Sequence, residues 1–148
     1  MRNPIIAALD VPDAEAALNL ARQLAPVVGA FKIGKELFVS AGPDIVRAIR
    51  NEGGAVFLDL KFHDIPNTVA RAVAAAAQLD VAMLTIHTSG GRDMMVAAEA
   101  AAQKTDNPPL VLGVTVLTSM DGSDLHEIGL AEDPAAQVER LAQLATKA

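Results

Sequence analysis

The segment FLDLKFHDIPNT, residues 57–68, carries three charged side chains that could do chemistry: Asp59, Lys61 and Asp64. On a β-strand, residues two apart point to the same side, so Asp59 and Lys61 share one side of the strand. The other side is apolar, with Val56, Leu58, Leu60 and Phe62. A lysine between two carboxylates keeps its proton, because both neighbours favour its charged form. It would then serve as a proton donor, or as a cation that meets negative charge developing on a substrate.

The alternative for Asp59 and Lys61 is an ion pair on a solvated strand face, which contributes little to stability. The apolar flanks favour a more enclosed setting, with helices on one side of the strand and a barrel interior on the other. Buried charges are costly unless they are paired, so an enclosed pair of this kind indicates a functional site.

Further polar residues lie at or near the ends of predicted strands: Asp10, Lys32, His87, Thr118 and Ser119. Each has a structural alternative. Asp10 either binds a ligand or tightens the turn before Pro12, and Lys32 either joins the site or extends into solvent. His87 is either catalytic or an interior histidine with satisfied hydrogen bonds. Thr118 and Ser119 either bind a polar ligand or form an ordinary turn.

Short apolar runs typical of strands alternate along the chain with longer helical patterns. The expected strands are residues 4–10, 28–33, 55–61, 81–87 and 110–117. Expected helices begin after Asp13, at Pro43–Asp44, near Asn67, at Gly91 and at Asp133–Pro134, with a short helical turn near Leu125. This alternation predicts βαβ units on a parallel sheet, whose strand ends meet at the same edge. The candidate residues should therefore gather there.

The turn after the first strand, LDVPDAE, has no glycine, and the chain has no GxxxxGK[ST] motif. Both observations disfavour a dinucleotide-binding or P-loop fold. We therefore predict an α/β fold of the TIM (β/α)8-barrel type, with about five of the eight βα units in this chain. Residues 1–148 are expected to form a single barrel domain that stops before the last three strands.

Composition narrows the class of protein. The formal net charge is −6, and the 148 residues contain four Phe but no Trp or Tyr, which disfavours nucleic-acid binding. There is no cysteine, which excludes disulfides, thiol nucleophiles and zinc–thiolate sites. No apolar run approaches the roughly 18 residues of a membrane span. We therefore expect a cytoplasmic protein that does not bind membranes. We also expect no metal site, because magnesium sites usually combine carboxylates without a lysine among them.

The pattern D-x-K-x-x-D-I-P-N-T at residues 59–68 resembles the orotidine 5′-phosphate decarboxylase family. The segments LDV (9–11), FKIGKELF (31–38) and VLTSMDGSDL (116–125) are similar to that family as well, and the resemblance runs from Ile5 to the end of the chain. It implies decarboxylation of orotidine 5′-phosphate to UMP, without metal or cofactor, in pyrimidine biosynthesis. It also implies a homodimer.

The resemblance assigns roles to individual residues. Lys32, Asp59, Lys61 and Asp64 match the family's alternating Lys-Asp-Lys-Asp array, in which Lys61 protonates C6 of the pyrimidine. Asp64, together with Ile65 and Thr68, matches residues contributed across the dimer interface. The remaining matches concern substrate binding: Asp10 holds the ribose hydroxyls, Ser119 beside Thr118 recognises the pyrimidine, and His87 lies near the site.

Two alternatives stay open. Related magnesium-dependent enzymes, the 3-keto-gulonate-phosphate decarboxylases and hexulose-phosphate synthases, carry a carboxylate at the position of Lys32, where a lysine would repel the cation. The other alternative is a catalytically incompetent half-barrel, because the family grips the substrate phosphate with loops after later strands. We expect the isolated chain to turn over substrate poorly for that reason.

Overall fold

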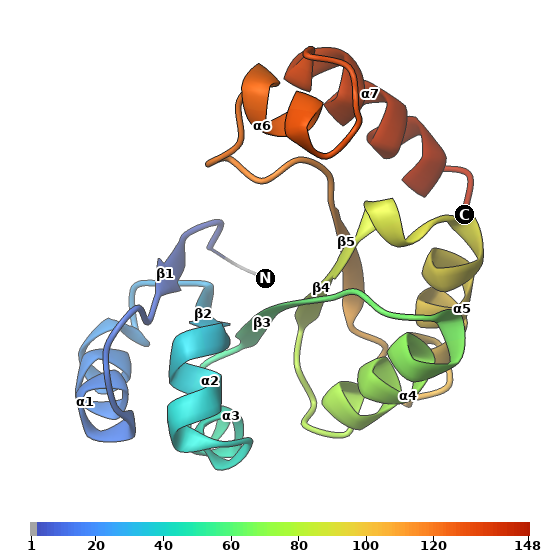
Figure 1. Cartoon of the computed structure of the whole chain (residues 1–148). Helices are drawn as coiled ribbons and strands as arrows, with labels where there is room; N and C mark the ends of the chain where they lie inside the picture. The colour runs from blue at the N-terminus through green and yellow to red at the C-terminus, as the bar shows by residue number, and fades with distance from the viewer. Residues whose placement is uncertain (1–2) are drawn as a thin grey trace.

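The computed structural model describes residues 3–148 and contains one five-stranded parallel sheet in the order β1-β2-β3-β4-β5 (Figure 1). Each strand pairs with the next along the chain, as expected for successive right-handed βαβ units. The strands are β1 (Ile6–Ala8), β2 (Ala30–Gly34), β3 (Val56–Phe62), β4 (Met83–His87) and β5 (Leu110–Val114). β1 and β5 form the two edges of the sheet.

Helices connect the strands, and several begin where the sequence predicts. The helices are α1 (Ala14–Leu24), α2 (Lys35–Ala41), α3 (Asp44–Asn51), α4 (Pro66–Ala77), η1 (Thr88–Gly90), α5 (Arg92–Ala102), α6 (Gly122–Glu127) and α7 (Pro134–Ala145). Asp13 and Asp133 cap α1 and α7, and each carboxylate accepts a hydrogen bond from a backbone amide three residues on. Within residues 3–148, no helix combines the length and apolarity needed to cross a bilayer.

Two differences from the expected elements affect the site, besides a first strand shortened to Ile6–Ala8 and the extra turn η1. Helix α2 follows β2 directly and was not predicted, because its N-cap is Gly34, which offers no capping side chain. Strand β5 ends at Val114 rather than Leu117, so residues 115–121 form a loop before α6. As an edge strand, β5 has a partner on one side only, which leaves its continuation without a second ladder to hold it extended.

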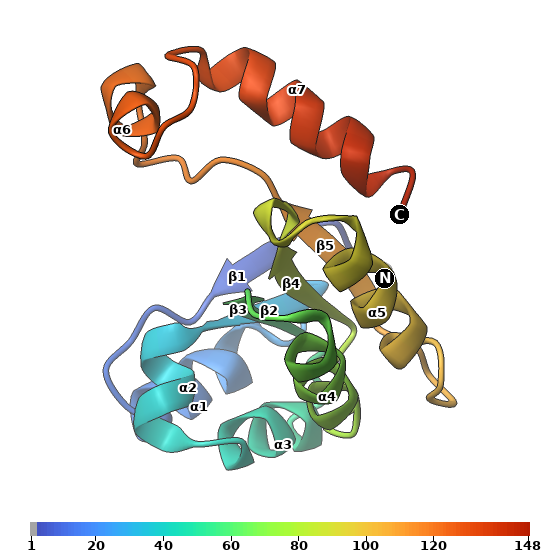
Figure 2. The ribbon, with the colours of Figure 1, turned by 45° about the vertical axis from the view of Figure 1, so that its right-hand side comes forward.

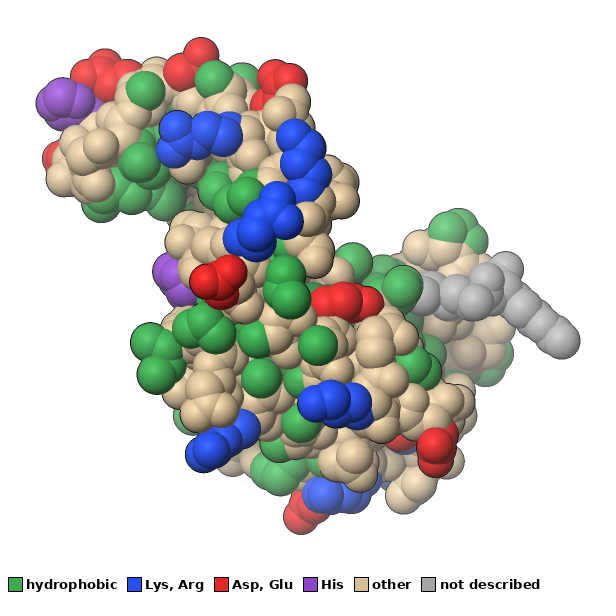
Figure 3. All heavy atoms as spheres, turned by 90° about the vertical axis from the view of Figure 1, so that its right-hand side faces the viewer, with side chains coloured by type: hydrophobic (Ala, Val, Ile, Leu, Met, Phe, Trp, Pro, Cys, Tyr) green, Lys and Arg blue, Asp and Glu red, His purple; other side chains and the backbone are tan. Residues whose placement is uncertain are grey.

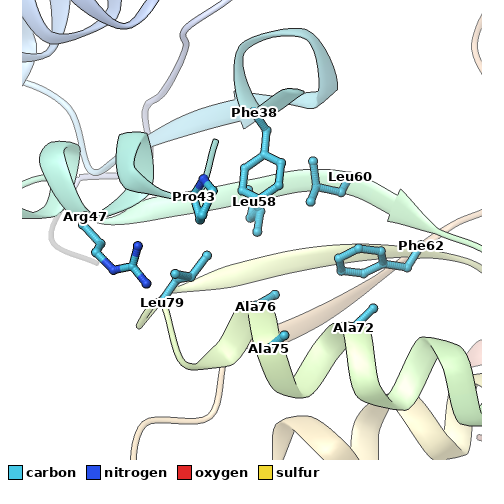
Figure 4. Close-up of a pocket in the computed structure, with 10 residues that line it drawn as sticks. All are labelled: Phe38, Pro43, Arg47, Leu58, Leu60, Phe62, Ala72, Ala75, Ala76 and Leu79. Atoms are coloured by element: carbon cyan, nitrogen blue, oxygen red, sulfur yellow. The ribbon is translucent and has the colours of Figure 1, made fainter. Parts of the chain in front are cut away.

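The hydrophobic core lies between the sheet and the helices α1 to α5 that cover its outer side (Figure 2). Alternate residues of the central strands enter it, including Phe31 and Ile33 of β2 and Leu58 of β3, all fully buried. Figure 4 shows the outer side of β3, where Leu58, Leu60 and Phe62 line an apolar pocket of about 410 Å³ together with residues of α4. The predicted apolar side of this strand is confirmed.

The segment after β5 stands apart from this body. Figure 3 shows it as a lobe that projects from the main body of the molecule, and α7 returns to contact η1 and α5. Leu125 of α6 and Leu141 of α7 are buried within it. On the edge strand β5, Leu110 and Leu112 are 64% and 37% exposed, whereas Val111 packs against the core. The edge strand β5 is thus less fully covered than the central strands β2, β3 and β4.

Candidate active site

Four of the predicted site residues line one pocket at the carboxyl ends of β1, β2 and β3. The pocket has a volume of about 200 Å³ and includes Asp10, Lys32, Asp59 and Lys61. These side chains lie on the side of the sheet opposite the apolar pocket behind β3. The strand alternation predicted from the sequence therefore brings the charges of three neighbouring strands together. Lys35 and Glu36, from the first turn of the unpredicted helix α2, line the same pocket.

Asp59 and Lys61 form the closest ion pair of this pocket. The Lys61 Nζ donates to both carboxylate oxygens of Asp59, at 2.8 and 2.7 Å. The Asp59 and Lys61 side chains are only 14% and 28% exposed, so this is not a solvated surface pair. Burial acts to raise the pKa of the Asp59 carboxyl, but hydrogen bonds from Lys61 and Thr85 and the positive charges of Lys61 and Lys32 hold that pKa below its ordinary value. The carboxylate is charged at neutral pH and keeps an ammonium beside it.

Lys32 pairs with a different carboxylate. Its Nζ donates to Asp10 Oδ1 at 2.9 Å, with the lysine side chain 24% and the aspartate 67% exposed. Lys32 nevertheless lies near enough to Asp59 to help lower its pKa. The pocket thus holds two acid–ammonium pairs side by side, Asp10 with Lys32 and Asp59 with Lys61.

The other residues of the DIPNT segment do not join these pairs within the chain. Asp64 is exposed, and its Oδ1 accepts a hydrogen bond from the backbone amide of Ile65 at 2.7 Å. Ile65 is 66% exposed and immediately precedes α4, where Thr68 is exposed in the first turn. These three side chains therefore present a solvent-facing surface next to the pocket.

His87 ends β4 and lies beside His63, with their ring centroids 5.3 Å apart. Burial lowers the pKa of His87, and the neighbouring positive or titratable groups His63, Lys35 and Lys61 lower it further, while Asp59 opposes them. The net pKa of His87 is below its ordinary value, so the ring is neutral at neutral pH. The same ring lines a small apolar cavity toward α6 and α7.

Thr118 and Ser119 lie in a tight turn, closed by a hydrogen bond from the Met120 amide to the Leu117 carbonyl. Both side chains are exposed. Within residues 3–148, neither hydrogen-bonds to the two acid–ammonium pairs. The sequence-based alternative of an ordinary turn describes their local structure.

Thr85 was not singled out in the sequence, yet it contacts both members of the central pair. Its Oγ1 lies 2.9 Å from the Lys61 backbone nitrogen and 2.9 Å from Asp59 Oδ1. It occupies the middle of the apolar run MLTIH on β4. Its only indication in the sequence is that a polar residue stands at an inward position of a strand that is otherwise apolar. In the part of the chain that is described, no three His, Cys, Asp or Glu residues cluster as a metal site would need.

Comparison with known proteins adds a further observation. Residues 3–148 match the model of the Orotidine 5′-phosphate decarboxylase / HUMPS family. An orotidine 5′-phosphate decarboxylase from Pseudomonas savastanoi pv. phaseolicola is 56% identical over 148 residues, which are 99% of this chain and 64% of the relative. The chain thus spans just under two thirds of the length of that curated relative.

Solved structures agree with the sequence match. The crystal structure of orotidine 5′-phosphate decarboxylase from Lactobacillus acidophilus matches 98% of this chain and 67% of its own, with a TM-score of 0.86 and 34% identity. An uncharacterized conserved protein from Geobacillus kaustophilus matches 97% of this chain and 69% of its own, with a TM-score of 0.90 and 38% identity. The predicted (β/α)8-barrel fold class is confirmed, with five parallel strands contributed by this chain.

Proposed function

Since the chain belongs to the Orotidine 5′-phosphate decarboxylase / HUMPS family, we propose that its acid–ammonium pocket decarboxylates orotidine 5′-phosphate to UMP. The observation that carries this proposal is the half-buried Asp59–Lys61 pair, in which one ammonium is held by both oxygens of a carboxylate. That arrangement offers a fixed, protonated lysine at the carboxyl edge of the sheet, where α/β barrels carry their active sites.

The reaction needs a fixed cation for a clear reason. When the bond between C6 and its carboxylate breaks, CO2 leaves and the electron pair stays on C6, in an orbital perpendicular to the ring π system. The ring carbonyls cannot delocalise that pair, so stabilisation must come from charges already in position. The Lys61 ammonium stabilises the carbanion and then transfers a proton to C6, which yields UMP and a neutral amine.

The neighbours of Lys61 have supporting roles. Asp59 orients the Lys61 ammonium, because both of its carboxylate oxygens accept hydrogen bonds from the Lys61 Nζ. Asp10, whose carboxylate is 67% exposed and held by Lys32, is free to accept hydrogen bonds from the ribose hydroxyls. Ser119 and Thr118 recognise the pyrimidine and His87 lies beside it, as the family resemblance implies. For Ser119 and Thr118, this requires the exposed turn after β5 to contact the ligand.

A homodimer completes the proposed site. The exposed side chains of Asp64, Ile65 and Thr68 adjoin the pocket but make no contact with Lys61 in their own chain, within the described residues. Their exposure supports a role across an interface, where Asp64 of each chain would approach Lys61 of the other. An interface at this surface would also bury the Ile65 side chain, which is 66% exposed in the single chain.

Lys32 separates this reaction from the magnesium-dependent ones of related enzymes. Its ammonium lies 2.9 Å from the Asp10 carboxylate, where it would oppose a divalent cation. Decarboxylation of orotidine 5′-phosphate should therefore be unaffected by EDTA, whereas loss of activity on chelation would favour the magnesium-dependent class.

The test uses a chimera, because the matched relative is longer than this chain. Residues 1–148 replace the matched part of the Pseudomonas savastanoi enzyme, to which they are 56% identical. The chimera should consume orotidine 5′-phosphate, followed by its absorbance. The same assay on the 148-residue chain alone measures how much activity these residues support by themselves.

Lys61→Ala should lower kcat of the chimera at least about a thousandfold, because it removes both the cation that stabilises the carbanion and the proton donor. Lys104→Ala is the matched control, because Lys104 is exposed after α5 and lines a pocket elsewhere, and it should leave kcat unchanged. A Lys61→Ala chimera with near-normal kcat would refute the assignment.

A further inference from the structure

The pairing of β3 with β4 is irregular at the active-site pair. Regular register holds on either side of the irregularity, at the pairs Leu58–Leu84 and Phe62–Ile86. Between these pairs, β3 has residues 59–61, whereas β4 has Thr85 alone. The extra length of β3 forms a bulge, a feature that re-aims side chains and is frequent next to active sites. Asp59 and Lys61 are the residues at its two ends.

Lys61 adopts a left-handed backbone conformation in this bulge, with φ of 53°. This conformation is unfavourable for a residue with a Cβ. Such a residue keeps it only where its surroundings hold it there, and such residues cluster at functional sites. The bulge also takes the Lys61 amide out of the regular backbone ladder, so that N–H needs another acceptor.

Thr85 supplies that acceptor. Its side chain is buried, with 4% of the residue exposed, and its Oγ1 accepts a hydrogen bond from the Lys61 N–H at 2.9 Å. The same hydroxyl donates to Asp59 Oδ1 at 2.9 Å. The hydroxyl has one proton to donate, and the direction of each of its two hydrogen bonds is fixed. The backbone amide of Lys61 can only donate, and the Asp59 carboxylate can only accept.

We infer that Thr85 is a positioning residue: its hydroxyl holds the backbone of Lys61 in the left-handed conformation and orients the Asp59 carboxylate toward the Lys61 ammonium. This role rests on the proposed function, because it concerns the geometry of the pair that performs the reaction. Thr85 acts through Asp59 and Lys61 and does not itself touch the substrate.

The chain of contacts explains why one hydroxyl matters. Lys61 is tied at both ends, by its amide to Thr85 and by its Nζ to Asp59, and Asp59 is tied to the same Thr85. The three residues close a ring of hydrogen bonds in a half-buried setting, where such bonds reinforce one another. Loss of the hydroxyl frees the amide and the carboxylate at once. The ammonium would then lose its fixed position relative to C6.

The decisive variant is Thr85→Val, which keeps the β-branched shape and removes the hydroxyl. The carboxyl pKa of Asp59 should rise, because one of the hydrogen bonds that lower it is gone. In the chimera, kcat should fall about tenfold to a hundredfold with KM changed less than about threefold, as expected when a reacting group is slightly misplaced. Thr85→Ser should restore both properties. NMR of carbon-13-labelled aspartate measures the pKa, in the 148-residue chain and in the chimera.

Thr88→Val is the matched control. Thr88 is fully buried, and its Oγ1 donates at 2.9 Å to the Val114 carbonyl, away from the Asp59–Lys61 pair. This variant should lose comparable stability and leave the Asp59 pKa and kcat unchanged. If Thr88→Val reproduces both changes, or if Thr85→Val causes neither, Thr85 is a structural residue only and the inference is overturned.

Two further experimental outcomes would still leave the role of Thr85 testable. If the chimera has no decarboxylase activity, the proposed function fails, while the Asp59 titration still decides whether Thr85 orients the carboxylate. If Thr85→Val does not fold, hydrogen exchange of the Lys61 amide in the unaltered chain provides the test. Slow exchange supports the bond to Thr85, and exchange as fast as in an unstructured peptide overturns it.

Discussion

Two regions of the molecule carry polar residues expected to meet the substrate, and they are built differently. Toward the carboxyl end of β3, Asp59 and Lys61 are half-buried and hydrogen-bonded to each other. After β5, Thr118 and Ser119 lie in an exposed turn with no bond to that pair, among the residues described. In the first region the charged side chains are held against each other within this chain, whereas in the second the hydroxyl side chains face solvent without a partner in the first region.

The position of each region in the sheet explains the difference. β3 has a paired strand on both sides, while β5 is an edge strand. Side chains of a central strand are fixed by neighbours on two flanks and by helices behind, as with the fully buried Leu58. Edge residues lack half of these contacts, and Leu112 of β5 is 37% exposed. Substitutions should therefore have large effects in the central region and small effects after β5.

The largest contrast is expected in catalysis by the chimera. Asp59→Asn should lower kcat by about a hundredfold to a thousandfold, the range seen when one preorganised electrostatic group is removed. Ser119→Ala should lower kcat/KM by about tenfold or less, because it removes one neutral hydrogen bond to the substrate. Steady-state assays of orotidine 5′-phosphate consumption give both values.

Asp106→Asn makes the matched control for Asp59→Asn. Asp106 is exposed in the loop before β5, at the opposite end of the sheet, and the amide should leave kcat unchanged. Equal losses for Asp59→Asn and Ser119→Ala would show that the two regions contribute alike, and the comparison would then be wrong.

Much of the central region could be predicted from the sequence, because it depends on local periodicity. The alternation of Leu58 and Leu60 with Asp59 and Lys61 is a property of any strand, and the structure confirms two sides of opposite character. The helix starts at Asp13 and Asp133 also carry a local signal, since each side chain caps its own helix.

What could not be predicted depends on pairing between strands. The bulge in β3 and the left-handed Lys61 arise from register with β4, and a lysine gives no local sign of a positive φ. Thr85 gains its importance from the same pairing, since it lies 24 residues from Lys61 in the chain. The sequence predicts too late an end for β5, because the apolar pattern continues to Leu117. The pairing with β4 ends earlier, at Val114.

Stability should show the same contrast between the two regions. Leu58→Ala removes a fully buried side chain behind the Asp59–Lys61 pair and should lower the free energy of unfolding by about 2–5 kcal/mol. Leu117→Ala is the matched substitution after β5, at a residue 38% exposed, and should lower it by less than about 1 kcal/mol. Urea denaturation followed by circular dichroism measures both, and a larger loss for Leu117→Ala would contradict the assignment of the core.

The smallest effect is expected from the pH dependence of stability. The pKa of His87 is lowered in the folded chain, first by burial and then by His63, Lys35 and Lys61, against the opposing charge of Asp59. When the pH falls below the ordinary histidine pKa of about 6.5, His87 therefore binds a proton in the unfolded chain but not yet in the folded chain. His87 thus makes the free energy of unfolding decrease from that pH downward, until its own lower pKa is reached.

His87→Gln should remove this contribution, so the free energy of unfolding should decline less between about pH 6.5 and pH 5 than in the unaltered chain. His126→Gln, at a side chain 71% exposed after β5, tests whether the loss of any histidine flattens the decline in the same way. Urea denaturation of the three proteins at several pH values measures the slopes. Only a histidine whose surroundings disfavour its charged form makes the free energy of unfolding decrease as the pH falls through this range. If His87→Gln keeps the full pH dependence while His126→Gln reduces it, the histidine in such surroundings is the one after β5, and the assignment to His87 is wrong.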